Sequence, residues 1–354
     1  MWNKPSFIVD KQKVKKNIEK MLRKADRNNV VFRPHFKTHQ SAEIGELFRE
    51  RGVSKIAVSS VSMARFFASD GWNDITIAFP VNLTEIEEID KLASEITLNL
   101  LVESIYSTEF LAEHLSFDVG IFVKIDTGYH RTGIDPQNLE DIEAIIYLIQ
   151  SSGKLHFKGF LAHAGHTYQA QSANEVRDIG SSSITQLKVL KKKFVHDFPH
   201  IIISYGDTPS CSILKNFSGA NEIRPGNFVY YDVMQMRIGS GTFDQIAAAV
   251  ACPVVAVHAE RNELVIYGGA VHLSKEYILD KNGFKNYGLV STLHENGWSE
   301  PIPFAYVSSL SQEHGIVRMP VSDISNFKPG NVIGILPVHS CLTANLLKED
   351  TYFL

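Results

Sequence analysis

The sequence lacks the features that mark several large classes of protein. It contains only three cysteines, Cys211, Cys252 and Cys341, without the spacing of a disulfide framework, which favours a reducing compartment. No long apolar run and no signal-peptide pattern are present, so we expect a cytoplasmic protein without a membrane segment. The net charge of -4 gives no excess of basic residues and no reason to expect a nucleic-acid partner.

The amino-acid composition is that of an ordinary folded protein. Of its 354 residues, 44% are apolar and 21% are charged, values typical of globular domains. A chain of this size buries enough apolar surface to fold without a disulfide or a structural metal. It exceeds one average domain, although a barrel domain alone takes up roughly 250 residues.

Short β-type runs alternate with helical patterns over the first two thirds of the chain. Eight strands are predicted, at residues 30–32, 55–59, 74–79, 97–102, 119–125, 156–161, 201–204 and 220–224. Helical patterns separate nearly all of them, which predicts parallel strands with crossover helices and favours a (β/α)8 TIM-type barrel over residues 1–243. A doubly wound open sheet is the alternative, because the same alternation fits both architectures.

The pattern changes near Asp244. Residues 254–257 and 264–267 are β-type runs on either side of Arg261-Asn262, which predicts a hairpin. Turn-rich β-type segments continue to the end of the chain. We therefore expect an α/β barrel followed by a C-terminal β domain at residues 244–354, on which the first ten or so residues can also pack.

Lys37 stands in an unusual setting. It lies between two histidines in residues 33–40 (RPHFKTHQ), directly after the first predicted strand. A lysine is normally a surface cation, but surroundings that lower its pKa turn its amine into a nucleophile that can form a Schiff base. Lys37 is therefore the candidate catalytic residue.

Other unusual clusters also follow predicted strands, where barrel enzymes carry their active sites. Residues 126–133 (DTGYHRTG), 163–168 (HAGHTY), 205–210 (YGDTPS) and 224–227 (RPGN) come after the fifth to eighth strands. The loops after strands seven and eight often bind phosphate, because glycines there let backbone N–H groups approach an anion. Each cluster alone is also explained by turn residues, a surface arginine or a core tyrosine.

A histidine and a cysteine occur two positions apart near the end of the chain, in residues 337–341 (PVHSC). On an extended segment such residues point to the same side, so His339 and Cys341 could bind one ion. Imidazole with thiolate favours zinc, and two protein ligands leave positions for water or substrate. The alternative is a buried cysteine beside an unrelated histidine.

Together these motifs resemble the D-serine dehydratase / D-threonine aldolase family of fold-type III pyridoxal-phosphate enzymes, over nearly the whole chain. The block at residues 33–39 is similar to the family's cofactor-lysine motif and implies that Lys37 carries the Schiff base. Residues 126–133 resemble the segment that brings an arginine, here Arg131, to the cofactor ring. We therefore expect pyridoxal 5'-phosphate as a cofactor.

The resemblance also implies how the rest of the cofactor is held. Tyr168 matches a tyrosine whose hydroxyl helps to hold the cofactor. The two loops after strands seven and eight match the family's phosphate loops, which implies contacts from Thr208, Gly226 and Asn227.

The metal pair and two departures complete the resemblance. His339 and Cys341 match the family's metal pair, and cysteine at the second position is similar to the dehydratases, since the aldolases commonly have aspartate there. Gln40 stands where a basic residue is usual, and Asp207 where a small hydroxyl residue is common. A carboxylate near a phosphate is unfavourable unless it points away.

The implied activity is a pyridoxal-phosphate- and zinc-dependent lyase that eliminates water from a D-3-hydroxy amino acid. The expected partner is a small-molecule substrate, D-serine, which would give pyruvate and ammonia. The resemblance also implies a homodimer. The alternatives are a metal-dependent D-threonine or D-3-hydroxyaspartate aldolase, a racemase, and a non-catalytic pyridoxal-phosphate-binding protein. A metal hydrolase using the barrel histidines His35, His39, His163 and His166 would leave Lys37 unexplained.

Overall fold

The computed structural model describes residues 2–354, which form two compact units. One unit is Glu19–Gly226, and the other combines the N-terminal segment up to Ile18 with Asn227–Leu354. The boundary after Ile18 falls inside the first helix, α1 (Lys11–Arg27). The domain limits at residues 243 and 244 stay a prediction.

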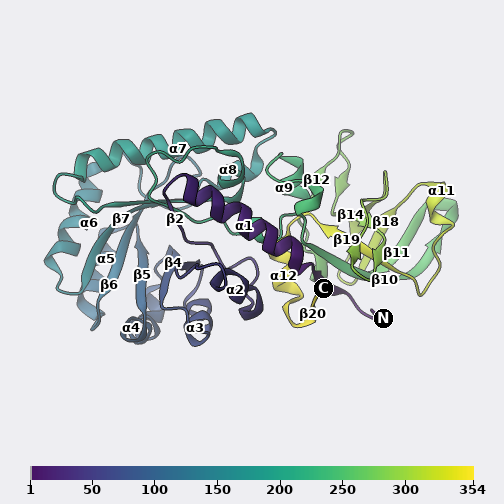
Figure 1. Cartoon of the computed structure of the whole chain (residues 1–354), viewed down its shortest axis with the longest axis horizontal. Coiled ribbons are helices and arrows are strands. Elements are labelled where there is room, and N and C mark those ends of the chain that lie inside the picture. Colours follow the sequence, from purple (N-terminus) through teal and green to yellow (C-terminus); the bar gives the residue numbers. More distant parts are fainter. Residues whose placement is uncertain (1) are drawn as a thin grey trace. The chain divides into compact units, whose positions relative to one another are not determined.

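The first of these units is a barrel of parallel strands (Figure 1). Its strands are β2 (Val31–Phe32), β3 (Ile56–Val58), β4 (Asp74–Pro80), β5 (Thr97–Val102), β6 (Val119–Lys124), β7 (Leu155–Ala162), β8 (Ile202–Tyr205) and β9 (Glu222–Ile223). They are hydrogen-bonded in the order β2-β9-β8-β7-β6-β5-β4-β3. The N–H of Phe36 donates to the carbonyl of Ala57 at 2.8 Å, and the N–H of Ala57 to the carbonyl of Pro34 at 2.9 Å. These two bonds close the ring, so the predicted (β/α)8 barrel and its eight strands are confirmed.

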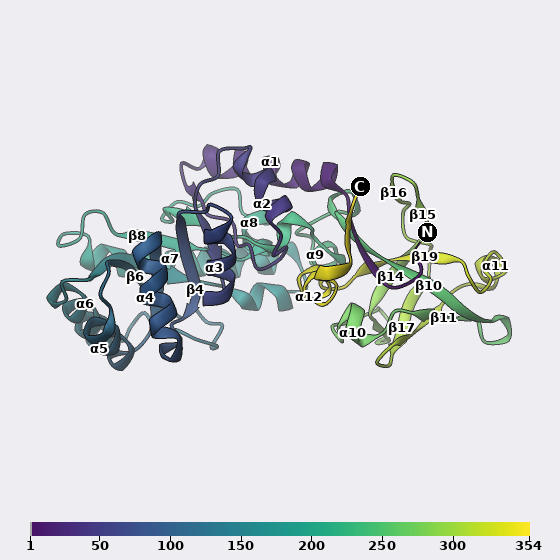
Figure 2. The same ribbon diagram turned by 90° about the horizontal axis from the view of Figure 1, so that it is seen from below.

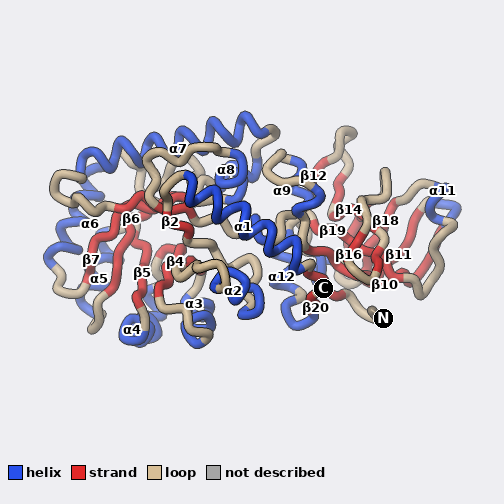
Figure 3. Tube along the Cα trace, in the orientation of Figure 1, coloured by secondary structure: helices blue, strands red, loops and turns tan. Residues whose placement is uncertain are grey.

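Helices alternate with the barrel strands and lie on the outer side of the sheet (Figures 2 and 3). They are α2 (Ala42–Arg49), α3 (Val61–Ser69), α4 (Ile86–Glu95), α5 (Ile105–His114), α6 (Leu139–Ser151), α7 (Ala173–Phe194) and α8 (Thr208–Ile213). Four of them begin at a serine whose hydroxyl accepts a backbone N–H of the first turn at 3.1 to 3.3 Å. These serines are Ser41, Ser60, Ser104 and Ser172. Within the described residues, no helix is long and apolar enough to cross a membrane.

The central barrel strands are mostly apolar, because much of their side-chain surface is covered on both faces. All six residues of β6 are buried. Leu101, Phe122 and Leu161, from three neighbouring strands, form a buried cluster against which Ile202 packs. Burial of this kind leaves the strand ends as the places where polar side chains can gather.

The second unit is built on an eight-stranded sheet in the order β11-β18-β17-β14-β19-β10-β1-β20. Its strands are β1 (Ser6–Val9), β10 (Ala248–His258), β11 (Glu263–Tyr267), β14 (Gly288–Ser291), β17 (Tyr306–Leu310), β18 (His314–Arg318), β19 (Val332–Pro337) and β20 (Thr351–Phe353). β10 also pairs with β11, so six strands form a closed ring from which β1 and β20 extend. β1 pairs with β10, and the predicted hairpin is confirmed as the antiparallel pair β10–β11.

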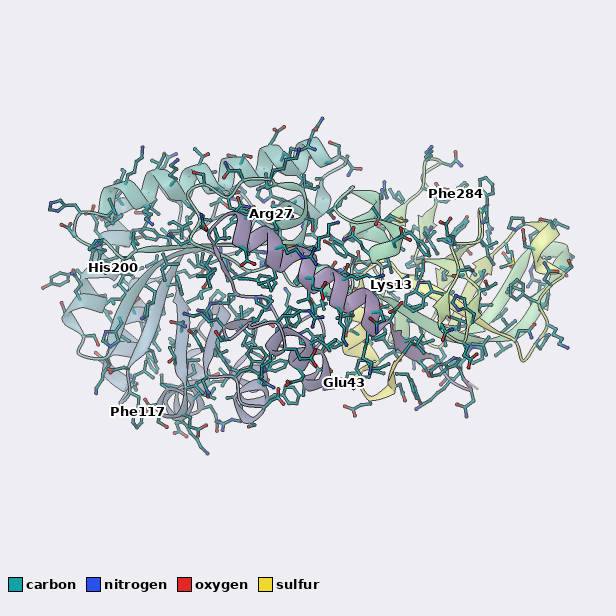
Figure 4. The ribbon with its side chains drawn as sticks, viewed as in Figure 1. Lys13, Arg27, Glu43, Phe117, His200 and Phe284 are labelled. Atoms are coloured by element: carbon teal, nitrogen blue, oxygen red, sulfur yellow. The ribbon has the colours of Figure 1, made fainter. Side chains whose placement is uncertain are left out.

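Short elements complete this unit. The helices are α9 (Val233–Arg237), α10 (Ala270–Leu273), α11 (Val321–Ile324) and α12 (Ser340–Leu346), and the small strand pairs are β12 (Ile278–Leu279) with β13 (Lys285–Asn286) and β15 (Leu293–His294) with β16 (Gly297–Trp298). Lys13, labelled in Figure 4 near the start of α1, donates to the carbonyl of Ile246 at 3.3 Å. Its ammonium lies 5.2 Å and 4.7 Å from the ring centroids of Phe243 and Trp298. These contacts hold the start of α1 within the unit.

Candidate active site

Lys37 lies in a turn after β2, at the end of the barrel where the strands terminate. The residues on either side of it, Phe36 and Thr38, are fully buried, whereas the Lys37 side chain is exposed. The backbone N–H of Lys37 donates to Nδ1 of His35 at 3.3 Å. The turn is therefore held by buried residues on both sides of an exposed lysine side chain.

His39, two residues after the lysine, belongs to the hydrophobic packing. Its ring stacks on Phe48, with the ring centroids 5.8 Å apart, and meets Phe36 edge-on at 4.4 Å. Burial lowers the pKa of His39 to about 3, so the imidazole is neutral at physiological pH. Its role is to support the lysine turn. A metal site built from the barrel histidines is not supported either, because the described residues contain no cluster of three or more histidine, cysteine, aspartate or glutamate side chains suited to a metal ion.

Two further imidazoles, His35 and His163, lie near Lys37. Burial lowers the pKa of both rings well below the ordinary value, and the positive charge of Lys37 lowers it further. Nδ1 of His163 is 2.6 Å from the carbonyl oxygen of Gly206, so this nitrogen carries the proton. Both rings are neutral at physiological pH, and Nε2 of His163 is left as an acceptor.

Arg224 is a site residue that the sequence-based predictions missed. Its side chain is buried; Nε donates to Oγ of Ser204 and Nη2 to the carbonyl of Ala162, both at 2.6 Å. Burial lowers the pKa of Arg224 to about 10, and its charge contributes to the lowered pKa of His35 and His163. The available signal was an arginine at the end of a β-type run, where barrel enzymes carry their active-site residues.

Arg131 is presented by a loop that a single carboxylate holds. Asp126 accepts hydrogen bonds from the backbone N–H groups of residues 128–130 at 2.9 to 3.1 Å. The exposed Arg131 guanidinium lies over the ring of Tyr129, 4.9 Å from its centroid. Its charge also lowers the pKa of His163. The loop therefore brings a second arginine to the surroundings of His163.

Three predicted cofactor residues lie in this same unit: Tyr168 in a 3-10 turn, Thr208 at the start of α8 and Gly226 in the loop after β9. The backbone N–H of Thr208 donates to the hydroxyl oxygen of Tyr168 at 3.4 Å. A Cβ added at Gly226 would lie only 3.0 Å from the carbonyl oxygen of His35 and 3.1 Å from Oγ1 of Thr38. A side chain at this position would press on the lysine turn, so glycine favours the close approach of this loop. The structure thus brings Gly226 against the turn and joins Tyr168 to Thr208.

Asp207, the carboxylate expected to be unfavourable near a phosphate, is bound within the scaffold. It accepts hydrogen bonds from the hydroxyls of Tyr205 and Thr167 at 2.8 and 2.9 Å and from the N–H of Ser210 at 2.7 Å. It is also the N-cap of α8. Burial raises the pKa of Asp207. Its oxygens are committed to these donors, so the carboxylate joins the tyrosine loop to α8.

A buried lysine ends strand β6. Lys124 is 5% exposed, and its ammonium donates to the carbonyl oxygens of Ile125 at 2.9 Å and Thr132 at 3.4 Å. Burial lowers its pKa to about 8. A cation at this depth is costly, and the two carbonyls compensate only part of the lost hydration.

His339 and Cys341 lie in the β-domain unit, at the junction of β19 and α12. The prediction that His339 and Cys341 lie on one extended segment is wrong. His339 is the N-cap of α12 and has an extended backbone, but Cys341 is the second residue of the helix. The chain turns helical here because the carboxylate of Asp232 binds the backbone N–H of Ser340 at 3.0 Å. The imidazole and the thiol are nevertheless hydrogen-bonded: burial opposes protonation, but Cys341 and the charge of Asp232 raise the pKa of His339 to about 9.

Asn227 also lies in this unit, and its side chain turns toward the metal pair. Its Nδ2 donates to the carboxylate of Asp232 at 2.6 Å, to Oγ of Ser340 at 3.1 Å and to Sγ of Cys341 at 3.4 Å. Its Oδ1 is buried without a hydrogen-bond partner among the described residues. Its assignment as a cofactor-binding residue stays a prediction.

The chemistry of both groups of residues fits what the resemblance implies. Around the lysine turn, Lys37, Arg131 and Arg224 bring positive charge among neutral histidines, which suits an anionic cofactor. In the other unit, an imidazole in contact with a thiol is a donor pair that zinc prefers. The orphaned Oδ1 of Asn227 is the kind of buried acceptor that a bound ligand normally satisfies.

The fold and these residues define a class: barrel proteins of the alanine racemase type with a lysine after the first barrel strand and an added β domain. Residues 9–233 match the family described as "Alanine racemase, N-terminal domain", and residues 247–352 match the "Putative serine dehydratase domain". The chain therefore belongs to the alanine racemase N-terminal domain family, with a C-terminal part of the serine dehydratase type, as the motifs predicted.

Individual relatives agree with this assignment. The D-serine dehydratase of Dictyostelium discoideum is 30% identical over 378 residues, which cover 98% of this chain and 92% of that protein. A solved structure of a D-threo-3-hydroxyaspartate dehydratase with a histidine replaced by alanine has a TM-score of 0.89 and 25% identity, and covers 98% of this chain and 90% of the other. A second variant of that enzyme, with the cysteine two positions further along replaced and in the metal-free form, has a TM-score of 0.89 and 24% identity, with coverages of 98% and 93%.

Proposed function

We propose that this protein is a pyridoxal-phosphate- and zinc-dependent D-serine dehydratase, which eliminates water and releases pyruvate and ammonia. The observation that carries the proposal is the placement of His339 and Cys341 together at the start of α12, with the Cys341 thiol held by Asn227, in a chain that also has the lysine turn. A racemase reaction does not require a metal pair. A non-catalytic pyridoxal-phosphate carrier requires neither the metal pair nor the β domain that bears it. The full-length likeness to a D-serine dehydratase supports the choice of substrate.

In this proposal one set of residues holds the cofactor, and Lys37 moves one proton. Lys37, Arg131, Tyr168, Thr208, Gly226 and Asn227 would hold pyridoxal phosphate. When bound, this cofactor supplies an electron sink for negative charge on the substrate α-carbon. Nζ of Lys37 takes the α-proton. His35 and His163, both neutral at physiological pH, lie near that amine.

The metal pair serves the other half of the reaction. Hydroxide is a poor leaving group, and zinc held by His339 and Cys341 would supply a Lewis acid for the substrate hydroxyl. The H-x-C pair favours this elimination over aldol cleavage, since the resemblance associates aspartate at the second position with aldolases. A dehydratase of the same fold with alanine variants at a histidine and a cysteine two positions apart, one of them metal-free, supports the ligand pair.

The first test is cofactor attachment. Borohydride treatment of the purified protein should fix the cofactor permanently, and peptide mapping should find it on Lys37. Lys37→Ala should lose the label, whereas Lys193→Ala, at an exposed lysine in the last turn of α7, should keep it. Protein that carries no fixed cofactor, or carries it elsewhere, contradicts the proposal.

The second test separates the two reactions. Pyruvate formation from D-serine, followed with lactate dehydrogenase, should be lost with a chelator and restored by zinc. His339→Ala and Cys341→Ala should abolish this activity and keep the label on Lys37. Glycine and acetaldehyde from D-threonine, without pyruvate from D-serine, would show that the protein is an aldolase.

Two further properties belong to the proposal. We expect a homodimer, from the resemblance, which light scattering during gel filtration would measure. We also expect a cytoplasmic protein, consistent with Cys211, Cys252 and Cys341, none of which forms a disulfide. Cell fractionation would check this location.

A further inference from the structure

A buried polar network surrounds the thiol of Cys341. Asp232 is 1% exposed and accepts from Nδ2 of Asn227 at 2.6 Å, from the N–H of Ser340 at 3.0 Å and from the N–H of Gln235 at 2.9 Å. The same Nδ2 reaches Sγ of Cys341 at 3.4 Å. A single buried amide therefore links the carboxylate to the thiol.

Asp232 fixes which way this amide points. The two ends of an asparagine amide are exchanged by a half turn of the side chain, but Oδ1 in place of Nδ2 would put two oxygens against each other at 2.6 Å. The NH₂ group must therefore face Asp232, and one of its hydrogens is available for Ser340 and Cys341. The orientation is determined by the carboxylate and is independent of any bound metal.

The other end of the same amide, Oδ1, also suits a bound ligand. Asn227 is 3% exposed, and its Oδ1 is buried without a hydrogen-bond partner within the described part of the chain. A buried acceptor without a donor costs about 1–3 kcal/mol. Such a group is retained where a ligand or a ligand-bound water supplies the missing donor.

We infer that Asn227 is a positioning residue for the metal pair, with Asp232 as the group that orients it. Its N–H holds Sγ of Cys341 in the direction of the ion and stabilises the negative charge of the coordinated sulfur. The inference rests on the proposed metal pair, His339 and Cys341, and assigns the Asn227 side chain to the metal. A backbone contact of Asn227 with the cofactor phosphate is compatible with this role.

The test measures metal binding directly. Zinc affinity of the full chain is determined by competition with a chromogenic chelator, for the unchanged protein and for Asn227→Ala. We expect an affinity about 10- to 100-fold lower in the variant, the usual effect of losing a group that orients a metal ligand. Asp232→Asn should also weaken zinc binding, because the amide then loses its orienting charge.

Asn17 offers a matched control. It is also 3% exposed and lies in the same unit, and its Nδ2 donates to the backbone carbonyls of Val229 at 3.2 Å and Gln245 at 2.8 Å. Asn17→Ala therefore removes the same group at the same depth without touching Cys341. Its zinc affinity should stay within about threefold, well inside the factor of ten that 1.4 kcal/mol represents.

Cobalt substitution provides a spectroscopic measurement, the wavelength of a charge-transfer band, that a general loss of stability does not change. In cobalt-substituted protein, the thiolate-to-metal charge-transfer band should shift to longer wavelength in Asn227→Ala, because a sulfur without its N–H donor gives up electrons more easily. Asn17→Ala should leave the band in place. If Asn227→Ala does not fold, Asn227→Ser keeps a donor near Asp232 while removing the amide that contacts Sγ.

The outcomes separate this inference from the proposed function. If the unchanged protein binds no zinc, or if Cys341→Ala binds as tightly, the metal pair itself is wrong. If zinc binding requires Cys341 but Asn227→Ala and Asn227→Ser keep both the affinity and the cobalt band, the role of Asn227 is refuted and the metal pair stands. Equal losses in the Asn227 and Asn17 variants also refute it.

Discussion

Replacing Arg33 by methionine should destabilise the barrel strongly. Arg33 is 4% exposed; its Nη1 lies 2.7 Å from Oδ1 of Asp74, and its Nε lies 2.7 Å from Oε2 of Glu222. Glu222 is 3% exposed, and its other oxygen accepts from Oγ of Ser204 at 2.6 Å. Arg33→Met would leave this carboxylate buried with one hydroxyl in place of its counter-ion.

The expected loss follows from the burial of Glu222. Removing one partner of a buried ion pair costs about 3–5 kcal/mol, because the remaining charge is not hydrated and has lost its direct counter-ion. For a domain of this size each kcal/mol lowers Tm by about 2–4 °C, so the barrel transition should fall by about 6–20 °C. Urea unfolding followed by circular dichroism would measure the free energy, and a thermal scan the shift in Tm.

A surface arginine gives the control. Arg65 pairs with Glu88, and their side chains are 35% and 57% exposed. Arg65→Met should therefore lose less than about 1 kcal/mol. Equal losses in the two variants, or a loss below about 1 kcal/mol in Arg33→Met, would refute the argument that the unpaired buried carboxylate sets the magnitude.

The ion pair between Arg33 and Asp74 predicts that the stability depends on pH. Burial alone would raise the pKa of Asp74, but the charge of Arg33 outweighs it and holds this pKa below its ordinary value of 3.8. The unfolded chain then binds more protons than the folded one as pH falls below that value. The contribution is complete at neutral pH and is lost in acid, so the stability difference between the unchanged protein and Arg33→Met should narrow as pH decreases below about 4.

Three further changes test other parts of the barrel. Lys124→Met should stabilise the protein at neutral pH, because a folded pKa of about 8 against 10.5 when unfolded makes the buried ammonium unfavourable. This gain should shrink as pH rises from 8 to 10.5, and a gain independent of pH in urea titrations would contradict the assignment. Asp207→Ala should cost roughly 1–3 kcal/mol in urea unfolding, since it removes the α8 cap and leaves buried donors unpaired. Gly226→Ala would put Cβ 3.0 Å from the carbonyl of His35 and should weaken cofactor binding on the order of tenfold, equivalent to about 1.4 kcal/mol. A fluorescence titration with an unchanged dissociation constant would speak against that close approach.

Local sequence patterns were sufficient for most of the fold. Each predicted barrel strand corresponds to a strand of the structure, because buried parallel strands are short apolar runs bounded by polar loops. The hairpin at Arg261-Asn262 was also predictable, since Asn262 adopts the left-handed backbone conformation (φ 59°) that asparagine tolerates. The helical turn that contains Cys341 could not be predicted from the sequence, because it depends on the carboxylate of Asp232, which is far away in the chain.

The sequence by itself determined that Lys37 and the H-x-C pair are the unusual chemical groups, because residue type and neighbours alone make them so. Tertiary structure alone decided what surrounds them. Arg224 became a site residue through its burial near His35 and His163. Asn227 came into contact with Cys341 across 114 positions of the chain. Burial and hydrogen bonding of this kind arise only when distant segments pack together, so the sequence marks at most the position of such a residue, as at the strand end for Arg224, and not its contacts.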